Sequence, residues 1–140
     1  MTGEGPKRYF TVAEAEALIP KLGEIVASLM EAQSRVKEIQ ETIQTEQEHI
    51  MASGGFAVDR ALWRERKSEL DKLVELLQDG MTEILELGAI PKDLQLGLVD
   101  FPHLLKGEEV NLCWRYGERE IRYWHGLDEG FAGRKALFLE

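Results

Sequence analysis

A seven-residue repeat of apolar side chains between residues 15 and 50 constrains this chain more than any other feature. Its two sets of positions are Ala15, Leu22, Leu29, Val36, Ile43 and Ile50, and Leu18, Ile25, Ala32, Ile39 and Glu46. This spacing is typical of the seam of a coiled coil. A helix over residues 11–51 would be roughly 60 Å long. Because such a helix cannot bury its apolar stripe against itself, the sequence predicts a partner helix.

The segment "ASGGFA", residues 52–57, predicts where the chain turns back. Its paired Gly54 and Gly55 are a strong helix-stop signal. We expect Asp59 to cap a second helix that ends at Gly88, shortly before Pro91. Its seam positions are Trp63, Leu70, Leu77 and Ile84, and Arg66, Leu73, Gly80 and Leu87. Two long helices with a short connection predict an antiparallel hairpin.

Local signals define the start of the first helix and an interruption within it. Thr11 and Glu14 have the spacing of a capping box, in which each side chain accepts a hydrogen bond from the other residue's amide. Pro20 lacks a backbone donor and clashes with the preceding turn. We therefore expect the helix to bend or break near Pro20.

The apolar stripes are wider than one two-helix seam requires. The additional positions include Val26, Met30, Val74, Leu76, Met81 and Leu85. They need cover from the C-terminal residues or from a second copy, so we expect a homodimer through the helices. Among the seam positions, Trp63 is expected in the core. Glu46 and Arg66 are polar, and polar seam residues commonly set register or partner choice. The alternative is that both lie beyond the packed zone, close to the hairpin tip.

After Pro91 the apolar period changes to two, which predicts strands. "GLVDF" is expected to be a short strand ended by Pro102, and residues 109–125 a hairpin that turns near Tyr116. If Arg115 pairs with Glu118, then Cys113 and His125 lie on opposite faces of the sheet, as do Trp114 and Trp124. The predicted fold is α+β. A long helical hairpin, residues 1–91, carries a small antiparallel β-meander, residues 92–140, in one structural unit.

Composition excludes several classes of function. Seventeen Lys and Arg against 26 Asp and Glu give a net charge of −9, which argues against a nucleic-acid partner. Cys113 is the single cysteine, so no internal disulfide can form, and this weakly favours a reducing compartment. No apolar run approaches the roughly 18 to 20 residues of a membrane span. We expect a cytoplasmic protein without a membrane partner.

The stretch "IRYWHGLDEGFAGR", residues 121–134, contains the best candidate site. His125 with Asp100 could form a general acid/base pair, because a carboxylate orients an imidazole and raises its basicity. The alternative is a purely structural hydrogen bond. In "GFAGR", the glycine-rich backbone and the Arg134 guanidinium could hold a phosphate or carboxylate. The alternative there is a tight loop, with Arg134 paired to Glu118 or Asp128.

Cys113 and the histidines offer metal-ligand atoms but no zinc motif. His49, His103, His125 and Cys113 lack the close spacing of such motifs, so we expect neither a metal nor another cofactor. Cys113 is expected to be a small buried apolar residue.

The segments "YFTVAEAEALIP", "LQLGLVDFP", "VNLCWRYGE" and "WHGLDEGFAGR" resemble those of a family of uncharacterised bacterial proteins, domain of unknown function 2203. The resemblance covers most of the chain apart from the tip of the helical hairpin. It implies no particular activity. The family motif positions carry over as Asp100, Cys113, Trp114, Glu118, Trp124, His125, Gly130, Gly133 and Arg134.

These features favour a self-associating interaction or regulatory module over an enzyme. A pocket for a small anionic ligand or a protein partner is expected in the C-terminal residues. It would consist of Asp100, Glu118, Trp124, His125 and Arg134, with Gly130 and Gly133 shaping the loop. One alternative is a small enzyme with His125 as general base, oriented by Asp100, and Arg134 binding an anionic substrate. Another is a coiled-coil effector whose hairpin tip, residues 49–56, contacts a larger assembly.

Overall fold

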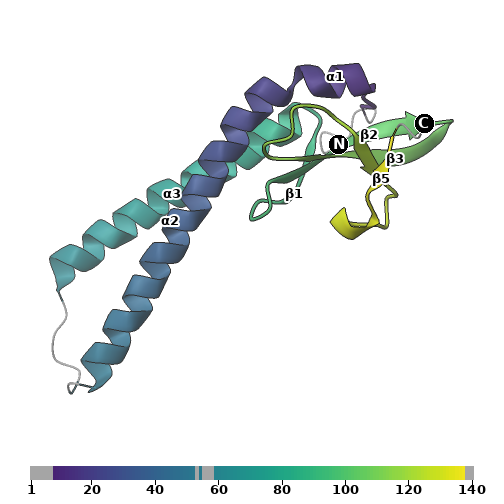
Figure 1. The fold of residues 1–140 in the computed structure, drawn as a ribbon. Helices are drawn as coiled ribbons and strands as arrows, with labels where there is room; N and C mark the ends of the chain where they lie inside the picture. The colour runs from purple at the N-terminus through teal and green to yellow at the C-terminus, as the bar shows by residue number, and fades with distance from the viewer. Residues whose placement is uncertain (1–7, 53, 55–58, 138–140) are drawn as a thin grey trace, which may run out of the picture.

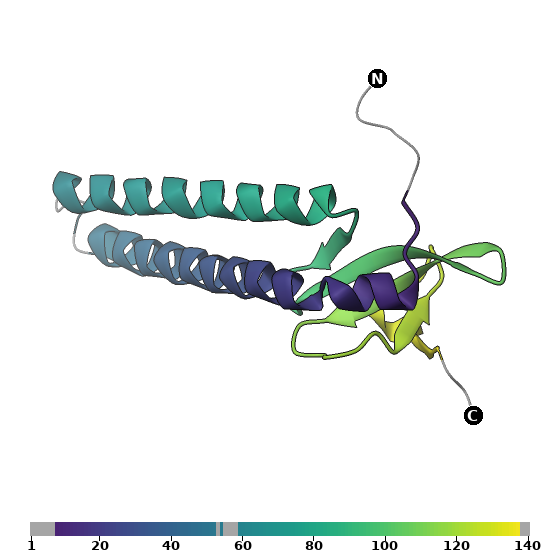
Figure 2. The same cartoon turned by 90° about the horizontal axis from the view of Figure 1, so that it is seen from above.

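Two long helices lie side by side and carry a small sheet at one end in a computed structural model of the chain (Figures 1 and 2). The structure describes residues 8–52, 54 and 59–137. The helices are α1, Val12–Ala17, α2, Ile19–Ala52, and α3, Arg60–Glu86. Five strands follow within the described residues, so the predicted α+β fold with a helical hairpin and a C-terminal sheet is confirmed.

The signals at the helix ends act as the sequence predicts. The Thr11 amide donates to Glu14 Oε1 at 2.9 Å, and the Glu14 amide donates to Thr11 Oγ1 at 3.1 Å, which completes the capping box. At the start of α3 the Asp59 side chain accepts from the Leu62 amide. The break ahead of Pro20 falls at Leu18, between α1 and α2. Pro20 thereby lies in the first turn of α2, where no amide donor is required.

The repeat on α2 faces the interior. Its buried members are Leu22, Ile25, Leu29, Ala32 and Ile39. On α3, Gly80 marks a close approach of the two helices, because a Cβ atom there would lie 2.4 Å from Leu29 Cδ2. Farther along, Arg66 Nη1 donates to Glu46 Oε1 at 2.7 Å. The two polar seam residues thus pair with each other across the hairpin.

Trp63 is not in the core, contrary to expectation. Its side chain is 58% exposed, whereas its neighbour Leu62 is half-buried. A straight α-helix drifts by about 20° for each seven residues relative to a strict repeat. Among the described residues of α3, Ile84 is the one that is fully buried, and three repeats separate it from Trp63. The accumulated drift of about 60° turns Trp63 away from the seam.

The sheet is an antiparallel meander with the strand order β1-β2-β3-β4-β5. Its strands are β1, Ile90–Asp93; β2, Leu98–Leu105; β3, Glu108–Arg115; β4, Tyr123–His125; and β5, Lys135–Ala136. One face packs on the helices through Val99, Phe101, Leu112 and Trp114, which share a core with α2 and with Ile84.

Strand β2 continues through Pro102, although the sequence predicted that it would end there. Strand β1 pairs with β2 only as far as Asp100, so Pro102 lies at an open edge on that side. Its carbonyl accepts from the Phe10 amide at 2.7 Å. A proline without an N–H donor is tolerated at such an edge.

The predicted register of the β3–β4 hairpin is wrong. The expected turn forms, since the Glu118 amide donates to the Arg115 carbonyl at 2.9 Å. The chain then leaves the sheet and returns only at Tyr123, which lies opposite Cys113. The intervening Ile121 is buried in the core, and its amide donates to Glu16 Oε2 at 2.9 Å. This anchoring of Ile121 shifts the register by three residues.

Two predictions about the faces of the sheet change with the register. Cys113 and His125 lie on the same face, and Trp114 and Trp124 share the opposite face.

Among the residues that the structure describes, the helices lack any stretch long and apolar enough to cross a bilayer.

Candidate functional site

Three polar or titratable side chains from adjacent strands meet on the face of the sheet that points away from the core. They are Asp100 on β2, Cys113 on β3 and His125 on β4, and we call them the Asp–Cys–His cluster. Asp100 lies directly opposite Cys113 in the β2–β3 pair. Asp100 and Cys113 are each 1% exposed and His125 is 2% exposed. A carboxylate oxygen, the thiol sulfur and an imidazole nitrogen of the three lie within 4.8 Å of one another.

Asp100 and His125 form the predicted polar pair. His125 Nε2 lies 3.0 Å from Asp100 Oδ1, and His125 Nδ1 lies 2.8 Å from the Gly126 carbonyl oxygen. Because a carbonyl can only accept, Nδ1 carries a proton. Burial raises the pKa of the Asp100 carboxyl, against the opposing effect of the His125 hydrogen bond. The second carboxylate oxygen, Oδ2, is buried and has no hydrogen-bond partner within the described chain.

Arg134 joins the cluster through Cys113. Its Nε donates to Cys113 Sγ at 3.3 Å, and its Nη2 donates to the Cys113 carbonyl and to Glu118 Oε1 at 3.1 and 2.7 Å. The guanidinium also lies over the rings of Tyr123 and Phe131. Burial raises the pKa of the Cys113 thiol, although the Arg134 hydrogen bond acts in the opposite direction. The charge of Arg134 is therefore balanced by Glu118 and enclosed by aromatic rings.

Two amides of the glycine-rich loop are used within the loop. The short helical turn η1, Phe131–Gly133, follows Gly130. The Gly133 amide donates to the Gly130 carbonyl at 2.9 Å, and the Arg134 amide donates to the Phe131 carbonyl at 3.1 Å. These contacts match the tight-loop alternative, in which Arg134 pairs with Glu118. The use of this loop as an anion site stays a prediction.

Trp124 is separated from the other predicted pocket residues. It lies opposite Leu112 on the helix-facing side of the sheet and packs against the core. Lys135 Nζ lies 4.7 Å from the centre of its indole. The remaining four residues, Asp100, Glu118, His125 and Arg134, are linked to one another through Cys113.

The comparison with protein families bears on this arrangement. A family model described as an uncharacterized conserved protein, DUF2203, matches residues 8–137. The chain belongs to the DUF2203 family. The match spans every described helix and strand, including the whole Asp–Cys–His cluster. No curated protein and no solved structure matches this DUF2203 chain at a significant level.

Sequence reasoning missed the part that Cys113 takes in this DUF2203 protein. The predicted β3–β4 register differs from the observed one by three residues, and it places Cys113 on the opposite face from His125. Ligand spacing along the sequence also fails to reveal the cluster, for a geometric reason. The three side chains come from three neighbouring strands, so their separations along the chain reflect connection lengths. The large apolar residues on either side of Asp100 (Val99, Phe101) and of Cys113 (Leu112, Trp114) were the signal that could have placed Asp100 and Cys113 together on the other face.

Proposed function

We propose that this DUF2203 protein is a self-associating interaction module in which two copies pair through α3. The observation that carries the proposal is a second apolar stripe on α3, outside the seam with α2. We call it the outer stripe, and it consists of Trp63, Leu70, Val74, Met81 and Leu85. These residues follow one another at alternating separations of seven and four, which keeps them on one flank of a helix. Trp63, Val74 and Leu85 are 58%, 44% and 57% exposed.

The outer stripe is symmetric along the helix, and this symmetry supports a second copy as its occupant. Trp63 and Leu85 each lie eleven residues from Val74. In an antiparallel pair of α3 helices with a two-fold axis at Val74, Trp63 of each copy would meet Leu85 of the other. Isologous contacts of this kind close after two subunits. The three most exposed members of the stripe would all be covered.

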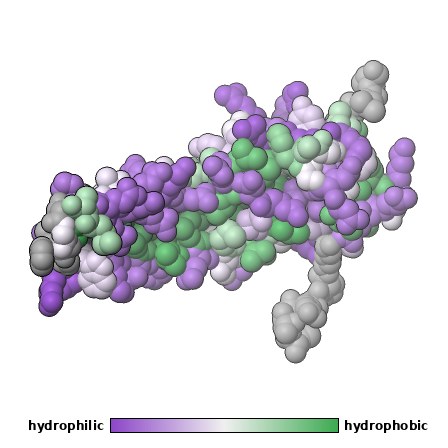
Figure 3. Space-filling model, turned by 90° about the horizontal axis from the view of Figure 1, so that it is seen from below, coloured by the Kyte–Doolittle hydropathy of each residue, from purple (hydrophilic) through white to green (hydrophobic). Residues whose placement is uncertain are grey.

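The available area suits a stable dimer. With its 27 residues, α3 is about 40 Å long, at 1.5 Å per residue. A contact face about 20 Å wide, close to half the circumference of one helix with its side chains, therefore offers about 800 Å² per copy. Standard protein interfaces bury about that area on each partner. Figure 3 shows apolar surface that continues along the helices between hydrophilic margins on the face it displays.

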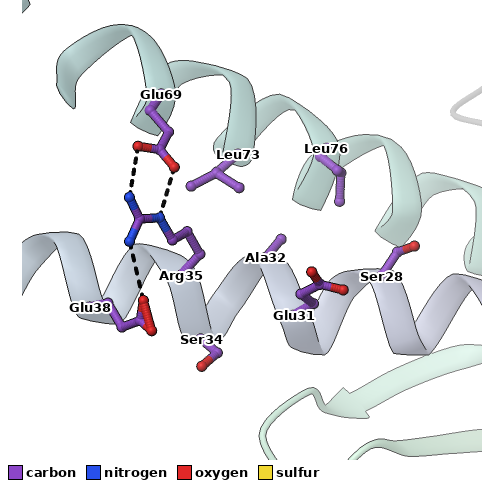
Figure 4. Close-up of a pocket in the computed structure, with 9 residues that line it drawn as sticks. All are labelled: Ser28, Glu31, Ala32, Ser34, Arg35, Glu38, Glu69, Leu73 and Leu76. Carbon is purple, nitrogen blue, oxygen red and sulfur yellow. Dashed lines mark hydrogen bonds and ion pairs between the residues drawn. The ribbon is translucent and has the colours of Figure 1, made fainter. Parts of the chain in front are cut away.

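The opposite flank of the helical hairpin is less suited to pairing. There Arg35 bridges the helices by donating to both carboxylate oxygens of Glu69, at 2.8 and 3.1 Å, beside Leu73 and Leu76 (Figure 4). Lys21 and Glu83 form a second ion pair across the helices on this flank. A partner covering Leu76 would have to desolvate two ion pairs that bridge the helices, which costs free energy. Beside the outer stripe the ion pair within α3 is Lys67 with Asp71.

Two matched substitutions test the proposal by sedimentation equilibrium at micromolar concentration. Val74→Glu would place two like charges at the two-fold axis, so we expect a folded monomer. Leu76→Glu is the control, because Leu76 is 41% exposed, close to the value for Val74, and lies on the opposite flank. We expect the control to remain a dimer. A monomeric wild-type protein, or equal behaviour of the two variants, would overturn the proposal.

The alternatives gain less support from the geometry. For a small enzyme, His125 would serve as general base, yet it is buried and both of its ring nitrogens have polar neighbours at 2.8 and 3.0 Å. Arg134, the expected anion ligand, is paired with Glu118. The hairpin-tip alternative concerns residues 49–56, of which 53, 55 and 56 lie outside the described residues.

A further inference from the structure

We infer that Asp100, Cys113 and His125 bind one divalent transition-metal ion of the zinc class. The three residues supply a carboxylate oxygen, a sulfur and an imidazole nitrogen, which are the atom types that Zn²⁺ takes in proteins. These atoms lie within 4.8 Å of one another and belong to side chains at most 2% exposed. The site is separate from the outer stripe, so it does not depend on self-association.

The hydrogen-bond pattern of His125 favours a cation beside its Nε2 atom. Nδ1 donates its proton to the Gly126 carbonyl, so in the tautomer with a single ring proton the Nε2 lone pair is directed at Asp100. A lone pair and a carboxylate oxygen 3.0 Å apart repel unless a positive charge lies between or beside them. A proton can supply that charge, and so can a metal ion. Metal-bound histidines typically donate their other N–H to a carbonyl or carboxylate, as His125 does here.

Two further observations show that the other two ligands, Asp100 and Cys113, are suited to bind an ion. Asp100 Oδ2 is buried without a hydrogen-bond partner in the described part of the chain, so a carboxylate acceptor is left for an ion. Cys113 Sγ accepts a hydrogen bond from Arg134 Nε at 3.3 Å, and such an outer contact holds a ligand atom in position. A divalent ion would balance the carboxylate and the thiolate, while Glu118 balances Arg134. The buried site would then carry no net charge.

The geometry requires only a small adjustment. Ligand atoms around a tetrahedral zinc ion are about 3.5 Å apart, given bond lengths of about 2.0 to 2.3 Å. The separations in the cluster extend to 4.8 Å, so side-chain shifts of about 1 Å would close the site. Three protein ligands leave a fourth position for water or an added anion. The thiolate and imidazole ligands favour Zn²⁺ or Co²⁺ over Mg²⁺ or Ca²⁺.

Titration of the full chain with Co²⁺, after removal of metals by a chelator, tests the inference. We expect one Co²⁺ per chain, a thiolate-to-cobalt charge-transfer band in the near ultraviolet, and displacement of Co²⁺ by Zn²⁺. Binding without that band, or no binding to the folded wild-type protein, would overturn the inference. This result needs no variant, so it stands even if substitutions in the cluster prevent folding.

Variants then assign the ligands. Cys113→Ser should abolish the charge-transfer band. Asp100→Asn and His125→Gln should each weaken Co²⁺ binding more than about tenfold, because even the loss of a residue that only orients a ligand typically costs about 10- to 100-fold. The control is His49→Gln, because His49 is exposed on α2, far along the chain from the cluster. It should bind Co²⁺ as the wild-type protein does. Folded Asp100→Asn and His125→Gln variants with wild-type affinity would contradict the assignment.

Discussion

Substitution of two helical glycines by alanine provides a quantitative test of how α2 and α3 pack. A Cβ atom at Gly23, in α2, would have no heavy atom within 4 Å, whereas one at Gly80 would lie 2.4 Å from Leu29 Cδ2 and 2.9 Å from its Cγ. Both positions gain helix propensity from alanine. Only the second also gains a steric conflict.

The two contributions can be compared in size. Alanine is favoured over glycine in a helix interior by about 0.8 to 1.0 kcal/mol, so Gly23→Ala should raise the free energy of unfolding by about that amount. Leu29 is fully buried and cannot turn aside freely. Overpacking of a filled core typically costs about 1 to 3 kcal/mol. Gly80→Ala should therefore be less stable than Gly23→Ala by about 1 to 3 kcal/mol.

Urea denaturation monitored by circular dichroism measures the free energy of unfolding of each variant. All samples are compared at the same protein concentration, because the stability of a dimer depends on it. Combining Gly80→Ala with Leu29→Ala identifies the cause, because removing the Leu29 side chain should eliminate the penalty of the Gly80 substitution. Equal stabilisation by the two alanine variants, or an undiminished penalty in the double variant, would refute a close approach of the helices at Gly80.

Two further substitutions test the N-cap of α1 and the anchoring of the β3–β4 connection. Thr11→Ala removes the capping box and should lower the free energy of unfolding by about 1 kcal/mol; Thr11→Ser, which keeps the hydroxyl, should cost less, and equal losses would contradict a capping role. Ile121→Ala should lower the free energy of unfolding by about 2 to 5 kcal/mol, as for other buried aliphatic residues. Its control, Leu127→Ala, is at a half-exposed position and should change the free energy of unfolding by less than about 0.5 kcal/mol. Similar small effects in thermal or urea unfolding would show that Ile121 is not in the core.

The helices were predictable from sequence because their determinants are local. The capping box at Thr11, the cap at Asp59 and the break before Pro20 each depend on a few consecutive residues, and all three are present in the structure. The heptad positions of α2 also face inward. The position of Trp63 was not predictable from the repeat alone, because the phase of a straight helix drifts over three repeats.

The candidate site depended on a contact that no local pattern reveals. The period-two alternation predicted β3, and the turn at Arg115 and Glu118 formed as expected. Burial of Ile121 against the helices then lengthened the connection and shifted the register of β4. That shift brought His125 to the same face as Cys113. The pairing of Asp100 with His125 was still predictable from their chemistry, whereas the part taken by Cys113 required the tertiary structure.

Disulfide trapping at Val74 tests the proposed pairing of two copies most directly. A disulfide requires Cα atoms roughly 4.4 to 6.8 Å apart. Two copies can therefore be joined efficiently through the same introduced cysteine only if it lies near the two-fold axis that relates them. Under mild oxidation, we expect Val74→Cys to form a covalent dimer rapidly, while Leu76→Cys on the opposite flank stays monomeric on a non-reducing gel. Absence of the Val74→Cys dimer, or equally fast cross-linking of the two variants, would contradict self-association through the outer stripe.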